Sequence, residues 1–460
     1  MNRIQIKSDL ANILVVGLPL VVNNLSSIAV NIADTLMASQ LGTTQLAAVA
    51  IGSGVWIALF LLGLGIIMAV GPTVAQHFGA RRFELIGHET RQGLLLGALL
   101  SFIVIGVMRS IEPLLLWMRI DAEVCRLAQG YLSALSWGVL AAYGYHTLKQ
   151  MTEGVGRTIP IMIVMGVMLP INIGINYILM FGKLGFDPLG AVGCGFGNAL
   201  SFWLMFLMLA GYTLTSRHYK KFGIACGKLR VEWQVFSRLI LLGLPIGVSL
   251  FLQSGLFTTV ALLMASLGTV AVAAHQIVLS YSGLVFMIPL GLAMALTVCV
   301  GQAVGRGDTS GAERIGYVGI ITCMVLSSVS AITTFYFGPV IASIYTQDKA
   351  VLELSVMLFK LAALLQLGDG VQVAGAFALR GLKDTRVPLI LNAINYWGFG
   401  FVAAYVLGIV FKFGAQGVWA GLSFALLSAA FLMVSRFIFL IRVTQAKALK
   451  RSHLGSNRQT

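Results

Sequence analysis

The chain has 460 residues, of which 58% are hydrophobic and 10% are charged, whereas a soluble domain carries about 25% charged residues. This composition excludes a soluble enzyme or soluble binding module and indicates an all-α integral membrane protein. The net charge of +15 alone would suit a nucleic-acid-binding protein, and the positions of Lys and Arg along the chain decide against that class.

Twelve apolar runs follow one another along the chain, each long enough to cross a roughly 30 Å hydrocarbon core as a helix of about 20 residues. We expect transmembrane helices at 10–38, 45–75, 92–111, 124–148, 158–181, 190–214, 236–265, 270–303, 314–338, 350–377, 388–411 and 415–441. The loops between them are too short for a catalytic domain, and no nucleophile, base or metal-site motif is present. We therefore expect neither an enzyme nor a bound cofactor or metal.

Lys and Arg gather in alternate loops of this predicted topology. These basic residues include the pair Arg81 and Arg82, and others lie in the connection 217–238 and in the tail from Arg436 to Arg458. Cytoplasmic loops of membrane proteins carry an excess of these residues, so the pattern predicts that both termini are cytoplasmic. It also accounts for the net charge, and we expect membrane lipid but no nucleic acid as a partner.

The sequence repeats itself at a constant offset of 226 residues: the stretch 17–50 resembles 243–276, with Pro19 recurring as Pro245. We expect an N-lobe at residues 1–220 with helices 1–6, and a C-lobe at 221–460 with helices 7–12 and a basic cytoplasmic tail. Because six is even, the repeats are parallel and related by an axis along the membrane normal. Two such pseudo-symmetric lobes with a cleft between them are typical of a transporter.

Asp34 is the only charged residue between Leu10 and Met37, inside the first predicted helix. A charge near the bilayer centre costs about 2.5–3.5 kcal/mol on insertion scales, so such residues are rare and mark substrate or ion pathways. Pro19 lies about four turns earlier on the same helix, where a missing backbone hydrogen bond permits a kink. The sequence therefore predicts a functional carboxylate on a helix kinked at Pro19.

Several blocks together identify a family resemblance that covers the chain from about residue 10 to 440. They are PLVVNNLSSIAVNIADTLMASQLGTTQLAAVAIGSGVW, VAQHFGARR, LPINIGINYILMFGKLG, LGAVGCGFGNA, VAAHQIVLSYSGLVFMIPLGL and ALRGLKDTRVP. In order and spacing they resemble the multidrug and toxic compound extrusion (MATE) transporters, NorM-like bacterial branch. The resemblance implies twelve helices in two lobes, a place in the bacterial inner membrane, and export of cationic lipophilic drugs or dyes by a monomer in exchange for protons or sodium.

The resemblance also assigns site residues. Asp34 is the acidic residue of the N-lobe, with Asn172 and Asn176 as its polar neighbours, and Asp369 is the carboxylate of the C-lobe. The sequence departs from the pattern at two further positions: Gln253 stands where many members carry a glutamate, and Leu365 where several carry a tyrosine. Since a hard cation such as Na⁺ prefers several oxygen ligands, this implies coupling to protons through Asp34.

Other interpretations stay open. Asp34 would be structural if it only bonded Asn172 to bend helix 1, and Asp369 if it only lined a wet cavity. A lipid or lipid-linked-precursor flippase is the alternative function. Such a flippase would line its cleft with several Arg or Lys to bind phosphate, and because Lys360 is the only basic residue that the sequence places deep in a helix, cation export is favoured.

Overall fold

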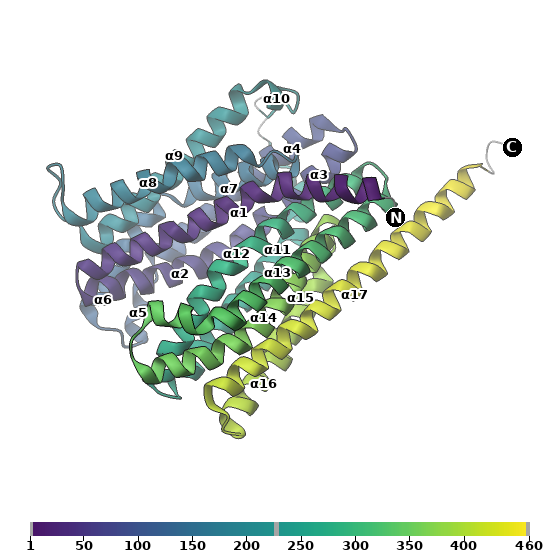
Figure 1. Ribbon diagram of the computed structural model, residues 1–460. Coiled ribbons are helices and arrows are strands. Elements are labelled where there is room, and N and C mark those ends of the chain that lie inside the picture. The colour runs from purple at the N-terminus through teal and green to yellow at the C-terminus, as the bar shows by residue number, and fades with distance from the viewer. Residues whose placement is uncertain (1–2, 225–229, 457–460) are drawn as a thin grey trace. The chain divides into compact units, whose positions relative to one another are not determined.

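The computed structural model describes residues 3–224 and 230–456, with side chains up to residue 446. Lys228 of the basic connection and the last residues of the predicted tail lie outside them. Within the described residues the chain is helical and contains no strand, as Figure 1 shows from purple to yellow along the chain. The all-α prediction is confirmed for this part of the chain.

The helices follow one another with short turns between them. In the first half they are α1 (Arg3–Gln40), α2 (Thr43–Ile67), α3 (Val70–Gly79), α4 (Phe83–Arg109), α5 (Glu112–Trp117), α6 (Ala122–Ser136), α7 (Val139–Gly154), α8 (Ile159–Phe181), α9 (Gly190–Thr215) and α10 (Arg217–Lys220). In the second half they are α11 (Trp233–Ala265), α12 (Thr269–Gly305), α13 (Thr309–Tyr345), α14 (Lys349–Gly381), α15 (Arg386–Ala393), the π-helical segment η1 (Ile394–Phe401), α16 (Val402–Tyr405), the π-helical segment η2 (Val406–Val410) and α17 (Gly414–Ser456).

Eleven helical segments in the described residues are long and apolar enough to cross a membrane. The remaining predicted span, 124–148, is interrupted, because α6 ends at Ser136 and α7 begins at Val139. Gly138 lies at this break against the backbone of α9, where a Cβ atom would come within 2.6 Å of Ala199 Cα. The indole N–H of Trp203 donates to the carbonyl oxygen of Trp137 at 3.0 Å, which satisfies a group that the break leaves free.

Packing divides the chain into two compact units whose borders fall inside helices. One unit is Val22–Gly247, and the other combines the residues up to Val21 with those from Val248 onward. The borders lie two residues after Pro19 in α1 and two residues after Pro245 in α11. Each of these helices therefore begins in one unit and ends in the other. The lobes 1–220 and 221–460, and the kink at Pro19, stay predictions.

We call residues 3–21 of α1 and 233–247 of α11 the exchanged segments. Asp9 in the first accepts a hydrogen bond from Arg314 Nε of α13 at 2.5 Å, and Arg238 in the second pairs with Glu89 of α4. Both carboxylates are buried, and an unpaired buried carboxylate costs several kcal/mol. One ion pair thus holds each exchanged segment in its unit.

The unit Val22–Gly247 is built around α9. This helix packs against α6, α7 and α8, while α2 packs on α6 and α4 on α7. In the other unit α14 lies centrally, in contact with α12, α13 and α17, and these long helices run alongside one another in Figure 1. In the unit Val22–Gly247 the last turns of α1 lie close to polar residues of α8 and α9.

Candidate functional site

Asp34 lies in the part of α1 that belongs to the unit Val22–Gly247, and only 7% of its surface is exposed. Asn176 Nδ2 of α8 donates to Oδ1 at 2.7 Å, and Asn198 Nδ2 of α9 donates to Oδ2 at 2.9 Å. Hydrogen bonds to an ionised acceptor are about twice as strong as neutral ones. No ion pair within the described residues involves Asp34. Two amide groups therefore hold the carboxylate, and no cationic side chain of the described residues neutralises its charge.

The amides form a connected network. Asn172 Nδ2 donates to Asn198 Oδ1 at 2.8 Å and to Ser201 Oγ at 2.9 Å, and Asn176 Nδ2 also lies 3.3 Å from Asn172 Oδ1. The structure thus brings Asp34, Asn172 and Asn176 together, as the resemblance implies. The direct hydrogen-bond partners of Asp34 are Asn176 and Asn198, whereas Asn172 donates to Asn198. Within the described residues Asp34 accepts from Asn176 and Asn198 rather than from Asn172, the partner on which the structural interpretation rests.

Sequence reasoning did not identify Asn198. A signal exists, because Asn198 and Ser201 are three residues apart on a glycine-rich helix, and such a pair shares one face. Gly197 beside it is also constrained: a Cβ atom there would lie 1.8 Å from Asn176 Oδ1. The close approach of α9 to Asn176 requires the glycine.

The network opens onto a cavity of about 550 Å³ lined by α1, α2, α6, α7, α8 and α9. Asp34, Asn172 and Asn198 form part of its wall. Aromatic side chains also line it, with the rings of Trp56 and Phe60 stacked at 4.6 Å between centroids.

Three methionines, Met165, Met168 and Met205, line the cavity as well. Their flexible, polarisable side chains adapt to ligands of different shape. The cavity can hold a flat apolar molecule beside one carboxylate.

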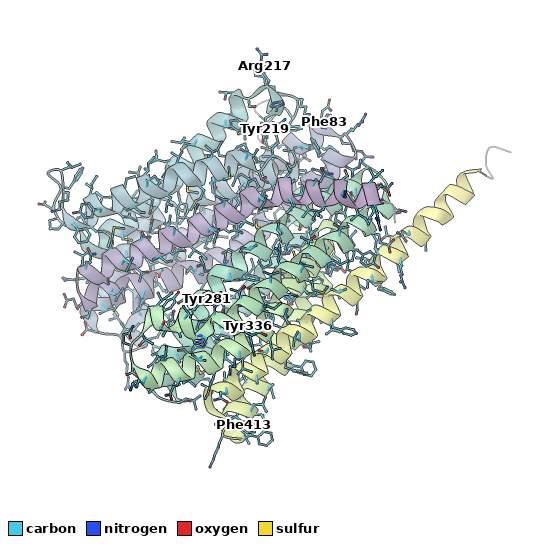
Figure 2. All side chains as sticks on the ribbon, in the orientation of Figure 1. Phe83, Arg217, Tyr219, Tyr281, Tyr336 and Phe413 are labelled. Atoms are coloured by element: carbon cyan, nitrogen blue, oxygen red, sulfur yellow. The ribbon has the colours of Figure 1, made fainter. Side chains whose placement is uncertain are left out.

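Asp369 belongs to the other unit and lines a smaller cavity of about 260 Å³ between α12, α13 and α14. The carboxylate is buried, and its Oδ1 has no hydrogen-bond partner among the described residues. Nearby, Gln366 Oε1 accepts from Ser330 Oγ at 2.7 Å. Tyr281, labelled in Figure 2, stands on the same cavity. Leu365 lines it, whereas Gln253, half-buried on α11, is not among the lining residues.

A sequence profile described as MatE matches residues 19–178 and 245–406. The two matches begin 226 residues apart, at the offset of the repeat, and together cover well over half of the chain. The chain belongs to the MatE family. The resemblance drawn from the sequence motifs is thereby confirmed, and the MatE family is one of membrane transporters rather than enzymes.

Relatives and solved structures agree with this assignment. The multidrug resistance protein MdtK of Yersinia pseudotuberculosis is 38% identical over 446 residues, covering 96% of this chain and 98% of the relative. MdtK of Yersinia enterocolitica is 37% identical over the same length. The eukaryotic MATE transporter AtDTX14 superimposes with a TM-score of 0.86 over 97% of this chain and 99% of its own, at 20% identity. A multidrug resistance MATE family transporter in an outward-facing conformation reaches 0.88 over 95% and 96%, also at 20% identity. The MatE fold of twelve transmembrane helices is confirmed.

Proposed function

We propose that this MatE transporter sits in the bacterial inner membrane and exports cationic lipophilic compounds in exchange for protons, with Asp34 as the proton carrier. The observation that carries the proposal is the buried carboxylate of Asp34, which has no ion-pair partner in the described residues and stands on a cavity partly lined by aromatic side chains. The name of the Yersinia relatives, multidrug resistance protein, supports the same substrate class.

The geometry suggests how proton and drug exclude each other. When Asp34 is ionised, its two oxygens accept the N–H groups of Asn176 and Asn198, and its charge attracts a cation into the cavity. A proton removes that charge and turns one oxygen into a donor, so that the hydrogen bond from one of the two amides is weakened. Since a single carboxylate holds either the proton or the attraction for the drug, the two compete, and competition at one site is what antiport needs.

Three further features belong to the proposal. Both termini face the cytoplasm, which the distribution of Lys and Arg supports. The chain works as a monomer whose lobes are residues 1–220 and 221–460. A flippase is less well supported, because only one Lys, Lys149, stands among the residues that line the Asp34 cavity, and a phosphate head group calls for several basic residues.

Sodium is expected to be dispensable. The Asp369 cavity offers a single carboxylate together with hydroxyl and amide groups, and Gln253 and Leu365 replace an acid and a phenol of the family pattern. In everted membrane vesicles without sodium, an imposed pH difference should drive dye transport at a near-normal rate. A steep rise of transport with a sodium gradient at constant pH would contradict proton coupling.

Exchange of a monovalent dye is expected to move no net charge. If Asp34 alone carries a proton, one positive charge enters for each that leaves, and the membrane potential contributes nothing. A second proton on Asp369 would add about 2.3 kcal/mol per 100 mV. In proteoliposomes at a fixed pH difference, efflux should stay flat while a potassium–valinomycin potential is stepped. A steep response that disappears in Asp369→Asn would show that both carboxylates carry protons.

A further inference from the structure

Lys149 is a second charged residue on the Asp34 cavity. Helix α7 places it in the wall of the cavity, with 7% of its surface exposed. Lys360 lies inside α14, as expected, but its side chain is exposed. Among the Lys and Arg side chains that the structure describes, the buried one is therefore Lys149, which no motif singles out.

The ammonium group of Lys149 is incompletely paired. Its Nζ lies 3.9 Å from Glu153 Oε1, beyond the range of a good hydrogen bond. Glu153 Oε2 accepts from Gln150 Nε2 at 3.2 Å, and Oε1 has no hydrogen-bond partner in the part of the chain that the structure describes. An ammonium group has three donors and no acceptor, and burial makes an unsatisfied donor costly. Lys149 can thus accept a further anionic partner from the cavity.

Asp34 and Lys149 lie toward different ends of the cavity. Lys149 is five residues before the end of α7, and Met165 is six residues after the start of α8, so both are near the turn that joins these helices. Asp34 bonds Asn176, which is eleven residues further along α8 than Met165. Aromatic, methionine, asparagine and serine side chains line the rest of the cavity. The cavity is therefore negative toward one end and positive toward the other.

We propose that Lys149 binds the carboxylate of aromatic zwitterions, whose cationic part lies toward Asp34. The inference rests on the proposed export function and assigns a specificity-determining residue to it. A substrate carboxylate beside Lys149 satisfies donors that Glu153 leaves unused, and a charge-assisted hydrogen bond forms in a site with little water. For a purely cationic substrate, the same ammonium group is repulsive. Lys149 thus sets the preference between the two kinds of substrate.

Rhodamine B and its ethyl ester provide a matched pair, because they share the cationic aromatic body and only the first carries a free carboxylate. Initial rates in everted vesicles under an imposed pH difference give KM for each dye. In Lys149→Gln, KM should rise at least about tenfold for the acid, as expected for loss of about 1.4 kcal/mol, and should fall for the ester. Lys149→Arg should keep the wild-type preference.

Two further variants separate this role from structural damage. Lys149→Gln combined with Glu153→Gln removes the buried carboxylate that the single change leaves unpaired, and should show the same opposite shifts in KM. Lys183→Gln, in an exposed loop, should behave as the wild type. Parallel shifts for both dyes, or a wild type that carries the ester but not the acid, would overturn the role of Lys149 and leave the export function standing. A wild type that carries neither dye would overturn both proposals.

Discussion

Replacing Asp34 by Asn is expected to reduce dye efflux to the level of cells without the transporter. The substitution keeps the size of the side chain and removes both the proton-binding group and the negative charge of the cavity. It also places an amide N–H against the donors of Asn176 and Asn198, both of which now donate to Asp34. The protein should still reach the membrane in normal amount, because insertion of a neutral residue costs less.

Efflux of a fluorescent cation from loaded cells measures this effect, with the amount of membrane-inserted protein determined in parallel. Asp187→Asn is the matched control, because Asp187 lies exposed in the loop between α8 and α9 and its change should leave efflux unaltered. Full drug resistance in cells carrying Asp34→Asn would remove Asp34 from the coupling mechanism.

Gly197→Ala is expected to disable transport from a position that touches no substrate. The added Cβ atom would lie 1.8 Å from Asn176 Oδ1, so the amide that holds Asp34 must move or the two helices must separate. Overpacking of a tight interior typically costs about 1–3 kcal/mol. We expect a lower Tm in detergent and a fall in efflux of at least about tenfold, because Asn176 can no longer donate to the carboxylate in the same geometry.

Gly211→Ala on the same helix serves as the control. A Cβ atom built there would have no atom of another helix within 4 Å among the described residues, and alanine favours a helix over glycine by about 0.5–1 kcal/mol. Its Tm should be unchanged or slightly higher, and its efflux normal. Wild-type efflux in Gly197→Ala would show that the hydrogen bond from Asn176 is not needed for transport.

Most helices could be predicted from the sequence because few backbone conformations are stable in the hydrocarbon core of a membrane. Apolar runs of about 20 residues must satisfy their backbone groups internally, so their length and order define the helices. The break inside the predicted span 124–148, between α6 and α7, could not be predicted in this way. At this break Gly138 lies against Ala199 of another helix, and hydropathy along the chain carries no information about such a contact.

The site was predictable in part for a similar reason. Asp34 is conspicuous as a lone charge in an apolar run, and the family pattern adds Asn172 and Asn176. Asn198 and Lys149 were not recognised, since an Asn in a glycine-rich helix and a Lys near a helix end are common. Only the packing of α7 and α9 against the cavity shows that these side chains face it. Roles for Asp369, Gln253 and Pro19 stay predictions.

The exchanged segments have a consequence for how such a chain arises. Each unit is completed by the first turns of a helix encoded in the other half of the sequence, at positions 226 residues apart. A half-length precursor with this arrangement would give its own first turns to a second copy and receive those of that copy, which is a domain-swapped homodimer. Gene duplication and fusion would then have preserved the swap within one polypeptide. Two half-length chains expressed from separate genes should accordingly be stable only together, each holding the other by its N-terminal turns.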